Sequence, residues 1–171
     1  VRDALVVVDE DGLIIEIHPQ GSVAAHEAAS AADTYTALPS STVLLPGLVD
    51  LHVHAPQWPQ LGTGLDLPLG DWLVDYPFPL ESRFDDLGFA QAVWSDLVGT
   101  LLAHGTTTAV YFSSRHLHAT TALAATCYRV GQRSFVGRVA MDHPEGTPPG
   151  YRDRSAEVGV SQSASSIEEI R

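Results

Sequence analysis

One stretch of the chain decides its fold: LLPGLVDLHVHAPQWPQLGTGLDLPLGDWL, residues 44–73. It opens with an apolar run that Pro46 and Gly47 divide, and the run ends on His52 and His54. Residues i and i+2 of a β-strand point to the same face, so the two imidazoles are predicted to lie side by side. Two neutral imidazoles at that spacing can hold one divalent metal ion. The alternative interpretation is a pair of ordinary polar residues at a strand end.

Downstream of the histidines, the sequence predicts alternating helices and strands. Apolar residues recur at helical spacing in residues 85–105, where Asp85 or Asp86 can cap the helix and Gly105 can end it. Alternation of this kind is typical of a parallel sheet, and the apolar strands predict a sheet that is covered on both faces. The predicted elements are, in order, a strand ending at 54, a loop over 55–84 with a short helix at 68–76, a helix at 85–105, a strand at 106–112, a helix at 116–131, a strand at 133–141 and a helix starting at 165–171.

Upstream, the sequence predicts a separate β-rich segment. ALVVVDEDGLIIEIHP, residues 4–19, reads as two short strands joined by a turn at Asp11 and Gly12, which is a β-hairpin pattern. An Ala-rich stretch at residues 22–38 predicts one weak helix and a loop. We therefore expect a partial β subdomain in residues 1–44 and a parallel α/β unit in residues 45–171.

Composition limits the class of protein. The 171 residues carry a net charge of -12, which argues against nucleic acid and anionic membranes as partners. The single cysteine, Cys127, cannot form an internal disulfide, so a reducing compartment is the simplest interpretation. The chain begins with Val and stops inside a predicted helix, and we interpret it as a fragment.

Several motifs resemble one enzyme family. PGLVDLHVH is similar to the metal motif of the amidohydrolase superfamily, at the end of the first barrel strand. The continuation APQWPQLGTGLDLPLGDWLVDYPFPLESRF resembles guanine deaminases, as do LLAHGTTTAVYF, GQRSFVGRVAMD and the Arg115–His116 pair between them. The resemblance covers residues 45–142. It implies an incomplete (β/α)8 metal-dependent hydrolase barrel, its first three strands, preceded by part of a small β subdomain.

The resemblance also implies an activity, the zinc-dependent hydrolysis of guanine to xanthine and ammonia. It implies one zinc ion per subunit, which would lower the pKa of a water so that hydroxide attacks the amino-bearing carbon. The amide of Gln57 suits a purine edge because it offers both a donor and an acceptor. The implied roles are metal binding for His52 and His54, substrate binding for His54, Gln57, Trp72 and Leu65, and a place beside the metal site for His116 and Asp142.

The resemblance implies that other parts of the site are missing. The family's remaining ligands and its proton-transferring glutamate lie beyond residue 171, so we expect no catalytic residue in this chain and no activity from it alone. A barrel of this class needs about 250 residues. For the full-length protein, the resemblance and the single cysteine predict a cytoplasmic homodimer.

Alternative interpretations stay open. The substrate can instead be another purine, a pyrimidine or a triazine, or the chain can be a truncated product without catalytic function. His116 can be a plain helix-start residue, Asp142 a helix cap at the end of the third strand, and Trp72 with Leu65 ordinary loop packing. Trp94 and Cys127 are predicted to be core residues, and His118 to be exposed. The cytidine-deaminase zinc signature is absent, because it needs more than one cysteine.

Overall fold

The structure is a computed structural model that describes residues 3–170. It divides into two compact units, Val1–Leu45 and Pro46–Arg171 in the sequence. Within the described residues, none of the helices combines the length and the apolar character that crossing a membrane requires.

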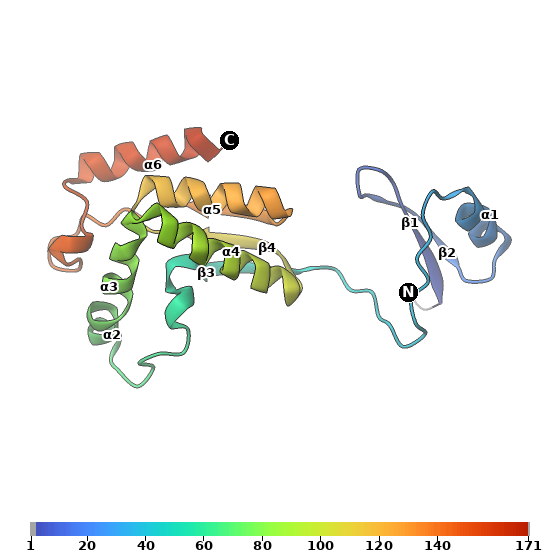
Figure 1. The fold of residues 1–171 in the computed structure, drawn as a ribbon, viewed down its shortest axis with the longest axis horizontal. Coiled ribbons are helices and arrows are strands. Elements are labelled where there is room, and N and C mark those ends of the chain that lie inside the picture. Colours follow the sequence, from blue (N-terminus) through green and yellow to red (C-terminus); the bar gives the residue numbers. More distant parts are fainter. Residues whose placement is uncertain (1–2, 171) are drawn as a thin grey trace. The chain divides into compact units, whose positions relative to one another are not determined.

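The first unit is a β-hairpin followed by a helix, as the sequence predicts. Strands β1 (Ala4–Val8) and β2 (Ile14–Pro19) pair antiparallel, and Gly12 occupies the turn with a φ of 82°. Helix α1 (Val23–Ala31) begins at Ser22, whose hydroxyl accepts the amide N–H of Ala25. The prediction of a weak helix in the Ala-rich stretch is therefore confirmed (Figure 1).

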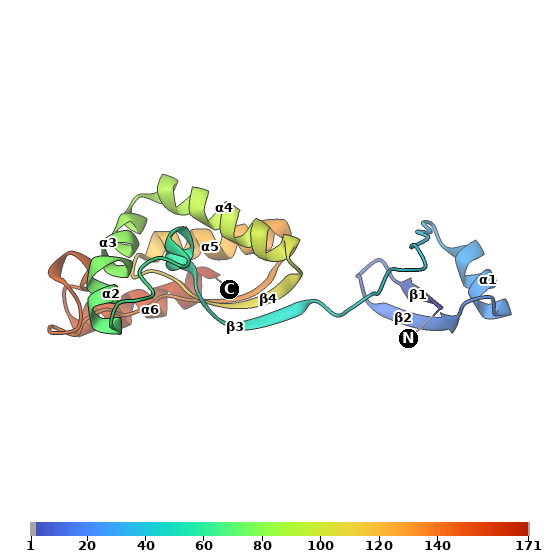
Figure 2. The same cartoon turned by 90° about the horizontal axis from the view of Figure 1, so that it is seen from below.

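The second unit is built on a three-stranded parallel sheet in the order β3-β4-β5. Helices follow each strand and cover one face of the sheet (Figure 2). The strands are β3 (Leu48–His54), β4 (Thr106–Phe112) and β5 (Arg133–Gly137), and the long helices are α4 (Leu87–Ala103), α5 (Leu117–Val130) and α6 (Ala156–Ile170). The shorter helices are η1 (Ala55–Gln60), α2 (Leu69–Asp75), α3 (Pro77–Ser82), η2 (Arg83–Asp85) and η3 (Pro149–Tyr151).

Local signals explain where the long helices begin and end. Of the two candidate caps for α4, Asp86 is the one used: its carboxylate accepts the amide N–H groups of Gly88 (2.8 Å) and Phe89 (3.1 Å). This satisfies donors that have no partner within the helix. Helix α5 stops at Gly131, which adopts the left-handed conformation that ends helices.

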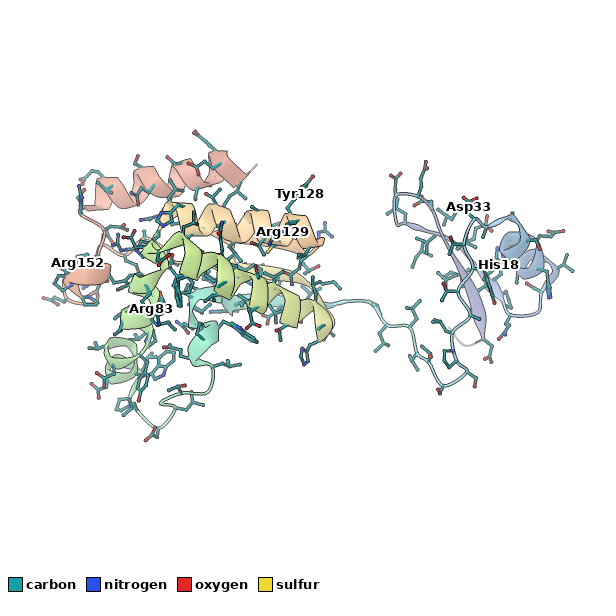
Figure 3. The ribbon with its side chains drawn as sticks, in the orientation of Figure 1. His18, Asp33, Arg83, Tyr128, Arg129 and Arg152 are labelled. Atoms are coloured by element: carbon teal, nitrogen blue, oxygen red, sulfur yellow. The ribbon has the colours of Figure 1, made fainter. Side chains whose placement is uncertain are left out.

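The core lies between the sheet and helices α4 and α5, which run side by side (Figure 1). Trp94 is fully buried, stacks on Phe84 at 4.6 Å between ring centres, and donates its indole N–H to the carbonyl of Ala119 at 2.9 Å. Cys127 is also fully buried, so both core predictions are confirmed. On the outside of α5, Tyr128 is 90% exposed and projects into solvent (Figure 3).

The prediction of a sheet covered on both faces was wrong for the described residues. Leu48, Val49 and Leu51 of β3 are between 58% and 68% exposed, and Phe135 of β5 is 59% exposed. Strand β3 pairs only with β4 and so forms an edge of the sheet. The helices bury one face, and the core residues from the strands are Ala109 and Tyr111 of the central strand.

The third strand and the last long helix differ from their predicted bounds. Strand β5 ends at Gly137 rather than Met141, since the main-chain N–H and carbonyl of Met141 bond to Asp153 instead of to a neighbouring strand. Helix α6 begins at Ala156, a few residues after the end of η3, instead of near Ser165. The predicted end of that helix, Arg171, lies outside the described residues.

A close main-chain approach precedes the sheet. Gly47 passes against Thr107, the second residue of β4, and a Cβ at position 47 would overlap three atoms of the Thr107 side chain. The next amide, that of Leu48, donates to the carbonyl of Gly105 at 2.8 Å. Only glycine therefore fits where the chain enters β3.

Candidate functional site at the strand ends

The two histidines converge at the carboxyl end of β3. The Nε2 atoms of His52 and His54 lie 3.0 Å apart. The parallel register pairs His54 with Phe112, the last residue of β4, and the Phe112 ring lies 4.9 Å from the His52 ring and 5.1 Å from the His54 ring. Asp50, two residues upstream, accepts the amide N–H of His52 at 3.0 Å. The strand periodicity thus brings both imidazoles to one point, as predicted.

This geometry fits two ligands of one zinc ion. Zinc–nitrogen bonds of about 2.0–2.1 Å in tetrahedral geometry place two nitrogens roughly 3.3 Å apart, close to the observed separation. Partial burial and the neighbouring His52 lower the pKa of His54, which favours the neutral form that binds metal. Among residues 3–170, no three His, Cys, Asp or Glu side chains are grouped to hold a metal ion, so these residues offer two nitrogens and no complete metal site.

Gln57 is held by a buried hydrogen-bond network. Its side-chain Nε2 donates to Oε1 of Glu81 at 3.1 Å, and the hydroxyl of Tyr151 donates to Oε2 of the same carboxylate at 2.6 Å. The Tyr151 oxygen in turn accepts the amide N–H of Arg115 at 3.2 Å. Glu81 is 7% exposed and Tyr151 is fully buried. The network joins the segments that follow β3, β4 and β5.

Burial sets the electrostatics of this network. It raises the pKa of Glu81, while the hydrogen bonds from Tyr151 and Gln57 act in the opposite direction by stabilising the carboxylate. Burial and the nearby carboxylate also raise the pKa of Tyr151, so its hydroxyl keeps its proton. The tyrosine is therefore available as a donor at neutral pH.

The predicted loop residues Trp72 and Leu65 lie downstream. Trp72, on α2, is partly buried and donates its indole N–H to the carbonyl of Thr63 at 2.8 Å. Leu65 is 76% exposed. The short helix predicted here is confirmed as α2. A role for either side chain in substrate binding stays a prediction.

The remaining candidates have different surroundings. His116 is 5% exposed at the start of α5, its Nδ1 lies 3.2 Å from the Ser114 hydroxyl, and its ring centre is 6.0 Å from that of Tyr151. Burial, followed by the charge of Arg115, lowers the pKa of His116 to about 4. Asp142 is exposed and lies five residues past the end of β5, so the prediction that it ends the third strand was wrong.

Sequence reasoning missed Glu81, Tyr151 and Phe112. Phe112 could have been found, because parallel strands end at the same sheet edge and it is the last apolar residue of its strand. Glu81 is the single charged residue in the apolar segment PFPLE, which is a weak signal of a buried partner. Tyr151 lies 70 residues from Glu81, and nothing local links them.

Comparison with known proteins places this architecture in a family. Residues 43–170 match the amidohydrolase family, and the chain belongs to that family. It is a homologue of guanine deaminases in particular. It is 42% identical over 127 residues to the guanine deaminase of Dictyostelium discoideum, matching 74% of this chain and 28% of that protein. It is 38% identical over 159 residues to that of Homo sapiens, matching 92% of this chain and 35% of that protein.

Solved structures agree with the sequence comparison. The guanine deaminase of C. acetobutylicum, with guanine bound in its active site, superposes with a TM-score of 0.80 at 25% identity, covering 98% of this chain and 38% of that one. The guanine deaminase of Bradyrhizobium japonicum gives 0.79 at 27% identity, covering 97% and 34%. The chain therefore spans about a third of the length of these relatives, and its mixed α/β architecture matches part of their fold.

Proposed function

We propose that the complete protein containing this chain hydrolyses guanine to xanthine and ammonia. The observation that carries the proposal is the 3.0 Å convergence of the His52 and His54 Nε2 atoms, with the amide of Gln57 on the segment that follows. The similarity of the chain to guanine deaminases, one of them solved with guanine in its active site, supports the substrate.

The residues of this chain have separate roles in the proposal. His52 and His54 hold one zinc ion per subunit together with ligands from elsewhere in the protein. A bound zinc ion supplies Lewis acidity, which makes water acidic enough to furnish hydroxide at neutral pH. Gln57 hydrogen-bonds the base, Trp72 and Leu65 form part of the pocket wall, and His116 and Asp142 lie near the metal site. The 171 residues alone carry no complete site and are proposed to be inactive.

We also propose which part of the complete protein each compact unit forms. Residues 1–44 are part of a small β subdomain, and residues 45–171 are the first three strands of a (β/α)8 barrel, whose site lies at the carboxyl ends of the strands. The convergence of both histidines and Phe112 at that edge supports this placement. The single cysteine and the family resemblance support a cytoplasmic homodimer as the complete protein.

The decisive experiment is a substrate panel with the complete, zinc-loaded protein. Xanthine formation is followed by absorbance for guanine, and ammonia release is measured for adenine, cytosine and an aminotriazine. We expect guanine to have the highest kcat/KM and a chelator to abolish its turnover. If the enzyme prefers another base, that base becomes the proposed substrate in place of guanine. If it hydrolyses none of the bases, a chain without catalytic function is favoured.

A further inference from the structure

The side chain of Gln57 is held by the buried carboxylate of Glu81. Glu81 accepts the Gln57 amide on Oε1 and the Tyr151 hydroxyl on Oε2, and it is 7% exposed. The three residues lie on η1, α3 and η3, so the contact is long-range and not a local turn. We infer that Glu81 is a positioning residue, which dictates the orientation of the Gln57 amide toward the substrate.

The argument rests on what each group can donate. A carboxylate only accepts hydrogen bonds, whereas the end of a glutamine side chain is a donor on one side and an acceptor on the other. If Gln57 had no polar neighbour, both orientations of its side-chain amide would be equally favourable. Next to Glu81 only the orientation with its NH2 toward the carboxylate is favourable, because the reverse would place two acceptors against each other in a buried site.

Tyr151 keeps Glu81 in the accepting form. The Tyr151 oxygen already accepts the amide N–H of Arg115, so its own hydrogen is committed to Glu81. The donors therefore run in one direction, from the main chain at Arg115 through Tyr151 to Glu81, and from Gln57 to the other carboxylate oxygen. Burial raises the pKa of Glu81, and the two hydrogen bonds that it receives act against this effect by stabilising the anion.

This network selects a class of substrate. With its NH2 committed, Gln57 presents its Oε1 atom as an acceptor and one remaining N–H as a donor. The matching ligand is a base whose edge carries an N–H donor beside an acceptor atom. Guanine has such edges, since its N1–H donor lies beside the O6 acceptor and its 2-amino donor lies beside the N3 acceptor. This inference rests on the proposed function, because it assigns Gln57 to the base.

The test is a double-mutant cycle in the complete enzyme. Glu81→Gln keeps the size of the side chain but can donate as well as accept, so it no longer dictates the orientation of Gln57. We expect kcat/KM for guanine to fall about tenfold, mainly through KM. In a Gln57→Ala background the same change should cost less than about twofold, because Glu81 then has nothing to orient.

Two further variants keep the result interpretable. Glu168→Gln, the same chemical change at an exposed residue of α6, is the matched control and should leave the kinetics unchanged. Tyr151→Phe removes the second donor to Glu81 and should lower kcat/KM by about threefold, again only when Gln57 is present. If Glu81→Gln does not fold, the Tyr151→Phe cycle decides the question.

The outcomes separate this inference from the function. Equal losses with and without Gln57 would show that Glu81 only stabilises the fold, and would overturn the inference, as would unchanged kinetics of Glu81→Gln. If the wild-type enzyme fails on guanine and hydrolyses another base, the proposed function falls. The cycle is then run on that base, where coupling between positions 57 and 81 supports the orientation role and its absence overturns it.

Discussion

The chain contains the pattern His-x-His twice, and the two pairs of rings are arranged differently in the structure. His52 and His54 end a strand, lie on one face, and bring their Nε2 atoms to 3.0 Å. His116 and His118 begin a helix, where their ring centres are 6.0 Å apart and one ring is buried while the other is exposed, as predicted for His118. The same spacing thus brings two imidazole nitrogens together on one backbone and leaves the two rings in different surroundings on the other.

The surroundings of the two pairs reinforce the difference. The first pair rests against Phe112 from the neighbouring strand, which leaves both Nε2 atoms directed to one point. In the second pair, the buried His116 contacts the Ser114 hydroxyl. The Nε2 atom of His118 lies 3.0 Å from the carbonyl oxygen of Asp85. His-x-His spacing therefore brings the two imidazoles together where the backbone is extended and separates them where a helix begins.

The strongest test of this contrast removes one histidine from each pair in the complete enzyme. His54→Ala should lower turnover of guanine by about a thousandfold or more, because a metal ligand is lost and hydroxide is no longer furnished at neutral pH. His118→Ala, the matched change in the helix, should leave kcat/KM unchanged. Xanthine absorbance and zinc content measure both. Comparable losses in the two variants would contradict the distinction.

A second test compares the residues three positions after each pair. Gln57→Ala should lower kcat/KM for guanine by roughly ten- to hundredfold, since one hydrogen-bonding partner of a buried base is worth about 1–3 kcal/mol. Thr121→Ala is its counterpart on α5, where the Thr121 hydroxyl donates to Glu169 at 2.9 Å on the helix surface. That variant should behave as wild type. Unchanged guanine kinetics in Gln57→Ala would remove the main support for guanine.

A third test measures zinc affinity directly in the 171-residue chain. We expect weak binding, because two imidazoles are fewer than the ligands of a closed zinc site. Competition with a chromophoric chelator should show an affinity about tenfold lower in His52→Ala, and no change in the double variant His116→Ala, His118→Ala. Nanomolar binding that survives His52→Ala would rule out the assigned ligands.

The last test is a pH dependence of stability that belongs to the second pair. The pKa of His116 is about 4 in the folded protein and 6.5 in its ordinary state. Between these values the unfolded chain binds more protons, so the stability present above pH 6.5 is lost as the pH falls toward 4. Urea unfolding should show a flatter pH profile for His116→Asn, with His118→Asn as the control. An unchanged profile would show that folding does not lower the pKa of His116.

Local patterns predicted much of the fold. The hairpin, the capping of α4 at Asp86, the end of α5 at Gly131 and the burial of Trp94 all depend on residues within one or two turns of each other. The convergence of the two histidines also depends only on strand periodicity. Features of this kind are readable because their causes lie close together in the sequence.

Features set by distant partners were not predicted. Strand β5 ends before Met141, whose main-chain groups bond to Asp153, and no pattern near Met141 reveals that partner. The contact between Glu81 and Tyr151 joins two segments on either side of two βα units. The exposure of β3 depends on which strands flank it, and apolar composition alone does not contain that information.

The close approach of Gly47 to Thr107 makes these two positions a coupled pair in evolutionary terms. If a single codon change places a side chain at position 47, that side chain collides with the β-branched Thr107 on the adjacent strand. Such a change becomes tolerable only after position 107 has first become smaller. A suppressor screen that starts from Gly47→Ala should therefore recover second-site changes at Thr107, and in diverging lineages the two positions should vary together.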